Sequence, residues 1–199
     1  MSQQSPKTDP LKHPDQRVGI FIDVQNLYYS AKNLYGAKVN FGNIVTSALA
    51  GRRLIRAIAY VVRTESREEQ PFFEALKNVG IETKERDLQI FLGGAKKADW
   101  DVGIAVDAIR LAPTLDAVVI VSGDGDFIEL VQYLKNQGRQ VEVAAFRETS
   151  SSALLEEVDS YTDLSADLDR FLIRDRKGAI NNVSERKPVR GKRRTEKNN

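Results

Sequence analysis

The chain has 199 residues, 41% of them hydrophobic and 29% charged, which is typical of one globular domain with a sizeable core. It has no cysteine and one histidine, His13, so disulfides, thiolate zinc sites and histidine-based catalysis are excluded from the core. Chemistry in such a core depends on carboxylates, hydroxyls, Lys, Arg and hard metal ions.

The net charge of +2 is distributed unevenly along the chain. Residues 174–199 carry ten of the 30 Lys/Arg and three of the 28 Asp/Glu, a net of +7, which leaves −5 for residues 1–173. Residues 174–199 have few apolar side chains, so we expect a basic disordered tail. The tail is either a solubilising or address segment, or a nonspecific arm that binds phosphates and releases counterions from nucleic acid.

The amino-terminal end is polar, and we expect residues 1–16 to form a disordered leader before a single domain at 17–173. This leader has scattered prolines and lacks the apolar region of a signal peptide. The chain also lacks a run of about 18 apolar residues, the length that a membrane span requires. These features predict a cytoplasmic protein without a membrane segment.

The hydrophobic pattern of the domain predicts alternating strands and helices. Strands are expected at 17–23, 54–62, 81–87, 117–121 and 141–146. Residues 88–92 are expected either to continue the third strand or to form a small hairpin. Helices are expected at 25–35, 40–50, 67–79, 99–112, 126–136, 151–157 and 165–173, with Asn40 as an N-cap. This alternation predicts an α/β fold with a mainly parallel sheet of about five strands in the order 3-2-1-4-5 and helices on both faces.

Aspartates follow the carboxyl ends of two strands that this order makes neighbours. Asp23 ends the first strand, and Asp124 and Asp126 follow the fourth strand after a turn. Ligands of open α/β sheets bind at this edge, so we expect these side chains in one crevice. Asp101, in the first turn of the helix before the fourth strand, is expected to point into the same crevice. Asp99 is expected either to cap that helix or to interact favourably with its dipole.

Carboxylates so close together repel one another, and an unpaired buried carboxylate is costly. Either some of them are protonated, or a divalent cation lies among them. Oxygen ligands without His or Cys favour Mg²⁺ or Mn²⁺, and such sites act mainly on phosphates. Asn26 and Ser122 can support the site by hydrogen bonding. Asp107 is expected to be either solvated or a buried partner of a basic group.

Several side chains near the expected crevice are candidate contacts for a nucleic acid. Lys96 and Lys97 precede the acidic helix start, and Arg63 follows the second strand at the same edge of the sheet. Tyr28 and Tyr29 lie in the first helix, where one is expected in the core and the other is available to stack on a base.

Three motifs occur in a defined order: FIDVQNL at 21–27, KADWDV at 97–102 and VSGDGDF at 121–127. Together they resemble the NYN domain family of the PIN-like nuclease group, in particular its bacterial LabA-like branch, over residues 17–165. The resemblance implies a three-layer α/β/α PIN-like (Rossmann-like) fold and a metal-dependent ribonuclease with an acidic Mg²⁺ or Mn²⁺ site. It also implies RNA as a partner and, by analogy, a homodimer, without a small-molecule organic cofactor. The metal ligands that it implies are Asp23, Asp101, Asp124 and Asp126, with Asn26 and Ser122 in support.

Two other functions stay open. LabA-like proteins include regulators, so the same fold and acidic site would suit a non-catalytic regulatory or RNA-binding module. The SGDGD sequence at 122–126 is also similar to the last acidic motif of haloacid-dehalogenase-like phosphatases, with Asp23 as the nucleophile. That chemistry needs a second acid two residues after the first, where this chain has Gln25.

Overall fold

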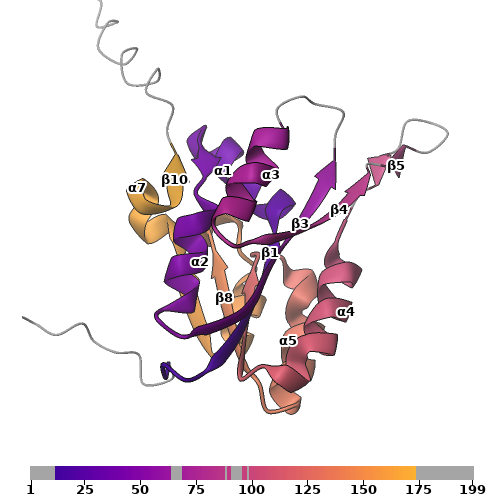
Figure 1. Cartoon of the computed structure of the whole chain (residues 1–199), viewed down its shortest axis with the longest axis vertical. Coiled ribbons are helices and arrows are strands. Elements are labelled where there is room, and N and C mark those ends of the chain that lie inside the picture. Colours follow the sequence, from indigo (N-terminus) through magenta and orange to yellow (C-terminus); the bar gives the residue numbers. More distant parts are fainter. Residues whose placement is uncertain (1–11, 64–68, 88, 91–95, 98, 174–199) are drawn as a thin grey trace, which may run out of the picture.

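A six-stranded parallel sheet forms the centre of the molecule, and helices cover both of its faces (Figure 1). The computed structural model describes residues 12–63, 69–87, 89–90, 96–97 and 99–173, and of residues 69–70, 89–90 and 96–97 it describes the backbone alone. Most of the predicted leader and the whole predicted tail lie outside the described residues.

The strand order of the main sheet is β4-β3-β1-β7-β8-β9. Its strands are β1 (Arg17–Asp23), β3 (Arg53–Arg63), β4 (Glu82–Asp87), β7 (Ala117–Val121), β8 (Gln140–Ala145) and β9 (Ser160–Asp163). Two short antiparallel pairs lie outside it, namely β2 (Lys38–Val39) with β10 (Leu172–Ile173), and β5 (Gln89–Ile90) with β6 (Lys96–Lys97). The five predicted strands therefore lie in the predicted order. The prediction missed β9 because its four residues, SYTD, are mostly polar and only half-buried.

Helices connect most of the strands and occur close to the predicted positions. They are α1 (Val24–Tyr35), α2 (Phe41–Leu49), α3 (Glu69–Asn78), α4 (Asp101–Leu111), α5 (Ile128–Asn136), α6 (Ser152–Glu157) and α7 (Leu168–Phe171). Single 3-10 turns are η1 (Ala112–Thr114), η2 (Gly125–Phe127), η3 (Arg147–Thr149) and η4 (Leu164–Asp167). Asn40 caps α2 as predicted, because its side chain accepts a hydrogen bond from the backbone N–H of Asn43. The helix predicted at 165–173 is wrong in extent: only η4 and α7 are helical, and Leu172 and Ile173 extend to pair with β2.

Two apolar clusters fill the space on either side of the sheet. Neighbouring residues of β1 alternate between them, with Ile20 and Ile22 in the cluster under α1 and α2, and Phe21 in the cluster under α4 and α5 (Figure 1). A strand that is buried on both faces needs apolar residues at every position, which explains the continuous apolar run of β7. In the described part of the chain, no helix combines the length and the apolar character that crossing a bilayer would require.

The central position of β1 decides where the candidate site forms. β1 lies between β3 and β7, and its residue Ile22 is in register with Val121 of β7. Both strands run in the same direction, so the residues that follow them emerge at the same edge of the sheet. Asp23 and Ser122 are therefore brought together although 99 positions separate them in the chain.

Candidate functional site

Asp23 and Asp124 are joined through the buried hydroxyl of Ser122. One carboxylate oxygen of Asp23, Oδ2, accepts a hydrogen bond from Ser122 Oγ at 3.3 Å, and Ser122 Oγ in turn accepts one from the Asp124 N–H at 3.3 Å. The other oxygen of Asp23, Oδ1, caps α1 by accepting from the Asn26 N–H at 3.0 Å. The structure thus brings together four of the predicted site residues from β1, α1 and the turn after β7.

The backbone after β7 is held closely from two sides. The Gly123 N–H donates to Asn26 Oδ1 at 3.2 Å, and the Gly123 carbonyl accepts from the Ser151 N–H at 2.9 Å. A Cβ atom added to Gly123 would lie 2.9 Å from the Cα of Ser150, so this position requires glycine for a close backbone approach. The Asn26 side chain therefore orients the turn that carries Asp124, through its hydrogen bond with Gly123.

Asp126 has a more peripheral place than the other predicted ligands. Asp124 Oδ1 accepts a hydrogen bond from the Asp126 N–H at 3.1 Å, which opens η2. The Asp126 side chain is exposed, whereas Asp124 is half-buried and Asp23 is buried. Burial among the acidic residues therefore decreases from the sheet outward.

The electrostatics of this group favour protonation or a cation. Burial raises the pKa of Asp23 above its ordinary value, and the negative charge of Asp124 raises it further. Hydrogen bonds from Asn26 and Ser122 to the carboxylate offset part of this rise. Burial, followed by the charges of Asp23, Asp124, Asp99 and Asp126, raises the pKa of Asp101 to about 6. Asp101 is the first residue of α4, and α4 contacts both β1 and η2, the elements that end at Asp23 and begin after Asp124. Its place among the site residues stays a prediction.

The donor set suits a hard divalent cation, although the carboxylates are not gathered around one point. Every donor is an oxygen from carboxylate, amide or hydroxyl groups, as Mg²⁺ and Mn²⁺ prefer. Among the described residues, no Lys or Arg forms an ion pair with Asp23, Asp101, Asp124 or Asp126. Within the same residues, no three His, Cys, Asp or Glu side chains are arranged so that they could already hold a metal ion together. An ion would have to draw Asp101 and Asp124 closer to Asp23.

The predicted substrate contacts have different outcomes. Arg63 forms an ion pair with Glu85 of β4, with 2.5 Å between its Nε and Glu85 Oε2. Tyr28 and Tyr29 are 44% and 51% exposed, so the prediction that one of them is in the core is wrong. The buried positions of α1 are taken by Val24, Leu27, Ser30 and Ala31. The side chains of Lys96 and Lys97 lie outside the described residues, and their contact with RNA stays a prediction.

Two other expectations concern α4. The N-cap position is Trp100 rather than Asp99, and no side chain caps this helix, so the capping role predicted for Asp99 is wrong. Asp107 is a partner of basic and polar groups, because its Oδ2 accepts from Tyr60 at 2.8 Å and pairs with Lys84 at 2.5 Å. Burial would raise the pKa of Asp107, but these hydrogen bonds outweigh it and hold the pKa below its ordinary value.

Sequence reasoning missed a contact beside the acidic group, between Arg86 of β4 and Trp100. The Arg86 guanidinium carbon lies 4.3 Å from the centroid of the Trp100 ring. Trp100 directly precedes Asp101 in the chain. Trp100 is the only tryptophan of the chain and lies inside one of the acidic motifs, which is the one signal that pointed to it.

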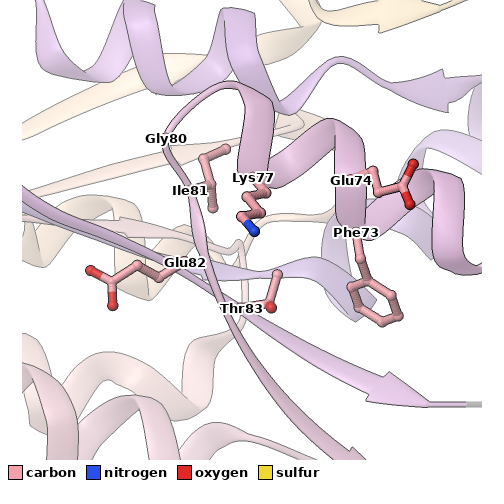
Figure 2. Close-up of a pocket in the computed structure, with 7 residues that line it drawn as sticks. All are labelled: Phe73, Glu74, Lys77, Gly80, Ile81, Glu82 and Thr83. Atoms are coloured by element: carbon pink, nitrogen blue, oxygen red, sulfur yellow. The ribbon is translucent and has the colours of Figure 1, made fainter.

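A surface hollow lies elsewhere, between α3 and β4 (Figure 2). It is lined by Phe73, Glu74, Lys77, Gly80, Ile81, Glu82 and Thr83. Of the predicted site residues whose side chains the structure describes, none lines it. The acidic group is therefore a feature of the sheet edge and is separate from this hollow.

Comparison with known proteins matches residues 17–166 to the model of the NYN domain family. The chain is 24% identical over 158 residues to the low amplitude and bright protein LabA of Synechococcus elongatus, across 75% of this chain and 84% of that protein. A crystal structure of a protein of unknown function from Vibrio parahaemolyticus RIMD 2210633 has the same fold, with a TM-score of 0.74 and 30% identity. The two structures match over 81% of this chain and 99% of the Vibrio parahaemolyticus chain.

Proposed function

This chain belongs to the NYN domain family, and from that premise we propose that it is a metal-dependent ribonuclease that hydrolyses RNA phosphodiester bonds. The observation that carries the proposal is the junction of Asp23, Ser122 and Asp124, together with the start of α4, the helix that contacts β1 and η2. Several carboxylates at one sheet edge, without a paired cation among the described residues, are costly unless they serve to bind one.

The residues of the site have distinct roles in this proposal. Asp23, Asp101 and Asp124 would hold the Mg²⁺ or Mn²⁺, and Asp126, which is more exposed, would be a further candidate ligand. When bound, such an ion would supply Lewis-acid activation of a phosphate and of a water molecule. Ser122 orients Asp23 by donating to Oδ2, and Asn26 orients the turn after β7 by accepting from Gly123.

Cleavage of RNA with Mn²⁺ present tests the proposal directly. Single-stranded and structured RNAs should be cut by the wild type, and cutting should stop when EDTA is added. The double variant Asp23→Asn/Asp124→Asn should lower the cleavage rate at least about 100-fold. Removing a residue that only hydrogen-bonds a metal ligand typically costs up to about 100-fold, and removing two ligands should cost more. Asp15→Asn is the matched control, since Asp15 is exposed and precedes β1 at the opposite end of the sheet. Full activity in the double variant would refute the proposal.

A second candidate is a non-catalytic RNA-binding or regulatory module. It is favoured by the finding that no three acidic side chains of the described residues are gathered as metal ligands. Binding of Mn²⁺ and RNA in calorimetry, with no cleavage over several hours, would support this module over the ribonuclease. A phosphatase is not proposed, because the position of its second acid is Gln25.

The remaining expectations concern the partners, the oligomeric state and the location of the protein. RNA as the partner is part of the proposal, and the tyrosines on α1 and Arg63 stay candidate contacts. A homodimer, the lack of an organic cofactor and a cytoplasmic location stay predictions. Light scattering on the purified protein tests the homodimer.

A further inference from the structure

Arg86 is the one arginine of the edge strand β4, and its guanidinium lies over the ring of Trp100. Its guanidinium carbon is 4.3 Å from the ring centroid, and its Nη1 donates to the carbonyl oxygen of Asp99 at 2.9 Å. Its side chain is nevertheless exposed to solvent. A guanidinium has five N–H donors, so one hydrogen bond leaves most of them available to a ligand.

The ring that carries Arg86 is itself held in place. Trp100 Nε1 donates to the carbonyl oxygen of Val61 at 3.0 Å, and the ring packs edge-on against Tyr60 with centroids 5.3 Å apart. Gly103 allows the ring to lie against the first turn of α4, because a Cβ at Gly103 would be 2.5 Å from Trp100 Cε3. The guanidinium is therefore pre-oriented, which lowers the entropy cost of binding a ligand.

Arg86 differs in its partners from three other cations of β3 and β4. Arg56 pairs with Glu82, Arg63 with Glu85, and Lys84 with Asp107. Among the described residues, Arg86 forms no ion pair with a carboxylate. A fixed cation that forms no ion pair within the described part of the chain is able to bind an anion at this sheet edge.

The position of Arg86 relates it to the acidic group. β4 and β3 run parallel to β1, so the carboxyl end of β4, where Arg86 lies, shares the sheet edge with Asp23. Its platform Trp100 directly precedes Asp101. The negatively charged phosphates of an RNA backbone are repelled by several carboxylates, and a neighbouring cation offsets that repulsion.

We propose that Arg86, held on Trp100, binds a phosphate of a single-stranded RNA that passes beside the acidic group. The inference rests on the proposed function, because it takes RNA as the ligand. It does not require the acidic group to be catalytic. The planar guanidinium suits a phosphodiester, whose two unesterified oxygens can accept two parallel N–H donors.

Tryptophan fluorescence tests this site directly, because Trp100 is the only tryptophan. The full chain is titrated with unstructured oligouridylate in EDTA, so that cleavage plays no part. RNA should change the Trp100 emission in a saturable way. In parallel, binding of fluorescein-labelled oligouridylate should be about tenfold weaker for Arg86→Ala, as loss of a charge-assisted contact predicts.

Matched variants separate a direct contact from a general charge effect. Arg86→Ala should lower the slope of log affinity against log salt by about 0.7, the value for one phosphate of a single strand. Arg86→Lys should restore the slope but only part of the affinity, because lysine lacks the planar fork. Arg53→Ala is the control, since Arg53 is exposed at the opposite end of β3. Thermal melting should show that Arg86→Ala is folded.

Two results would overturn the inference: equal affinity and salt slope in Arg86→Ala and wild type, or RNA binding that leaves Trp100 emission unchanged. Either result leaves the ribonuclease proposal to the cleavage assay with Asp23 and Asp124 variants. Conversely, an Arg86 effect on RNA binding in a protein that never cleaves would support this site and refute the ribonuclease.

Discussion

Ser122 has no exposed surface, yet its hydroxyl takes part in both hydrogen bonds that connect Asp23 with Asp124. Sequence reasoning identified these three residues because each follows an apolar run at the carboxyl end of a strand. It did not identify Arg86, and the cap that it assigned to α4, Asp99, was wrong. A contact between an edge strand and a distant helix start leaves no periodic pattern in the sequence, and the cap of a helix depends on local backbone angles.

The raised pKa of Asp101 predicts a stability change with pH in the metal-free protein. Its pKa of about 6 lies above the ordinary value, so the folded state holds the proton more tightly than the unfolded chain. The stabilisation is complete below the ordinary pKa and is lost as the pH rises through about 6. In EDTA at pH 7.5, Asp101→Asn should therefore be more stable than wild type by about 1 kcal/mol, an amount that allows for solvent screening.

Thermal melting in EDTA at several pH values measures this effect. The melting temperature of Asp101→Asn should exceed that of wild type by about 2–4 °C at pH 7.5, and the difference should shrink towards pH 5. Asp15→Asn, an exposed control, should follow the wild type at every pH. A constant difference between Asp101→Asn and wild type across this range would contradict the assignment of the shift to Asp101.

At the scale of elements, a buried ion pair ties the α2–β3 turn to β8. Arg52 and Glu142 are 4% and 2% exposed, and two parallel hydrogen bonds of 2.5 and 3.0 Å connect them. Arg52 also donates to the carbonyl oxygens of Ala48 and Leu49 at the end of α2. Sequence patterns did not predict this connection, because both residues belong to types that are usually exposed.

Removing one partner of this pair should destabilise the protein strongly. Arg52→Met leaves a buried carboxylate with Lys12 at 3.3 Å as its remaining ion-pair partner, and we expect a loss of about 3–5 kcal/mol. For a domain of this size that corresponds to a melting temperature roughly 10 °C lower. The double variant Arg52→Met/Glu142→Leu should recover much of the loss, because the unpaired charge is gone.

The exposed pair Arg56–Glu82 provides the control for this experiment. Its side chains are 38% and 51% exposed, so Arg56→Met should cost about 1 kcal/mol or less. Equal destabilisation by Arg52→Met and Arg56→Met in urea unfolding would show that burial of the first pair does not matter.

At the scale of the whole molecule, the order of five strands was predictable, and the sixth was not. Parallel strands buried on both faces read as continuous apolar runs, and the alternation with helices then leaves few topologies. The polar strand β9 and the two-residue strands β2 and β10 carry no such pattern. Their pairing depends on neighbours that only the folded chain provides.

The charge asymmetry of the whole chain predicts the salt dependence of RNA binding. Deleting residues 177–199 removes most of the net +7 of the basic tail. If the tail contacts phosphates, each lost contact lowers the slope of log affinity against log salt by about 0.7. Filter binding of oligouridylate at several salt concentrations measures the slope, and calorimetry with Mn²⁺ should be unchanged. An identical slope after deletion would exclude the tail as a phosphate-binding arm.

The central place of β1 also has a consequence for the timing of synthesis. Asp23 leaves the ribosome about a hundred residues before its partners Ser122 and Asp124. Until β7 is synthesised, β1 can pair with β3 but lacks its second neighbour in the sheet. Pairing across such a separation makes folding slow relative to local helix formation. A nascent chain that ends before β7 therefore contains only part of the acidic group. Any activity of this group begins only after most of the domain has been translated, so incomplete chains stay inert.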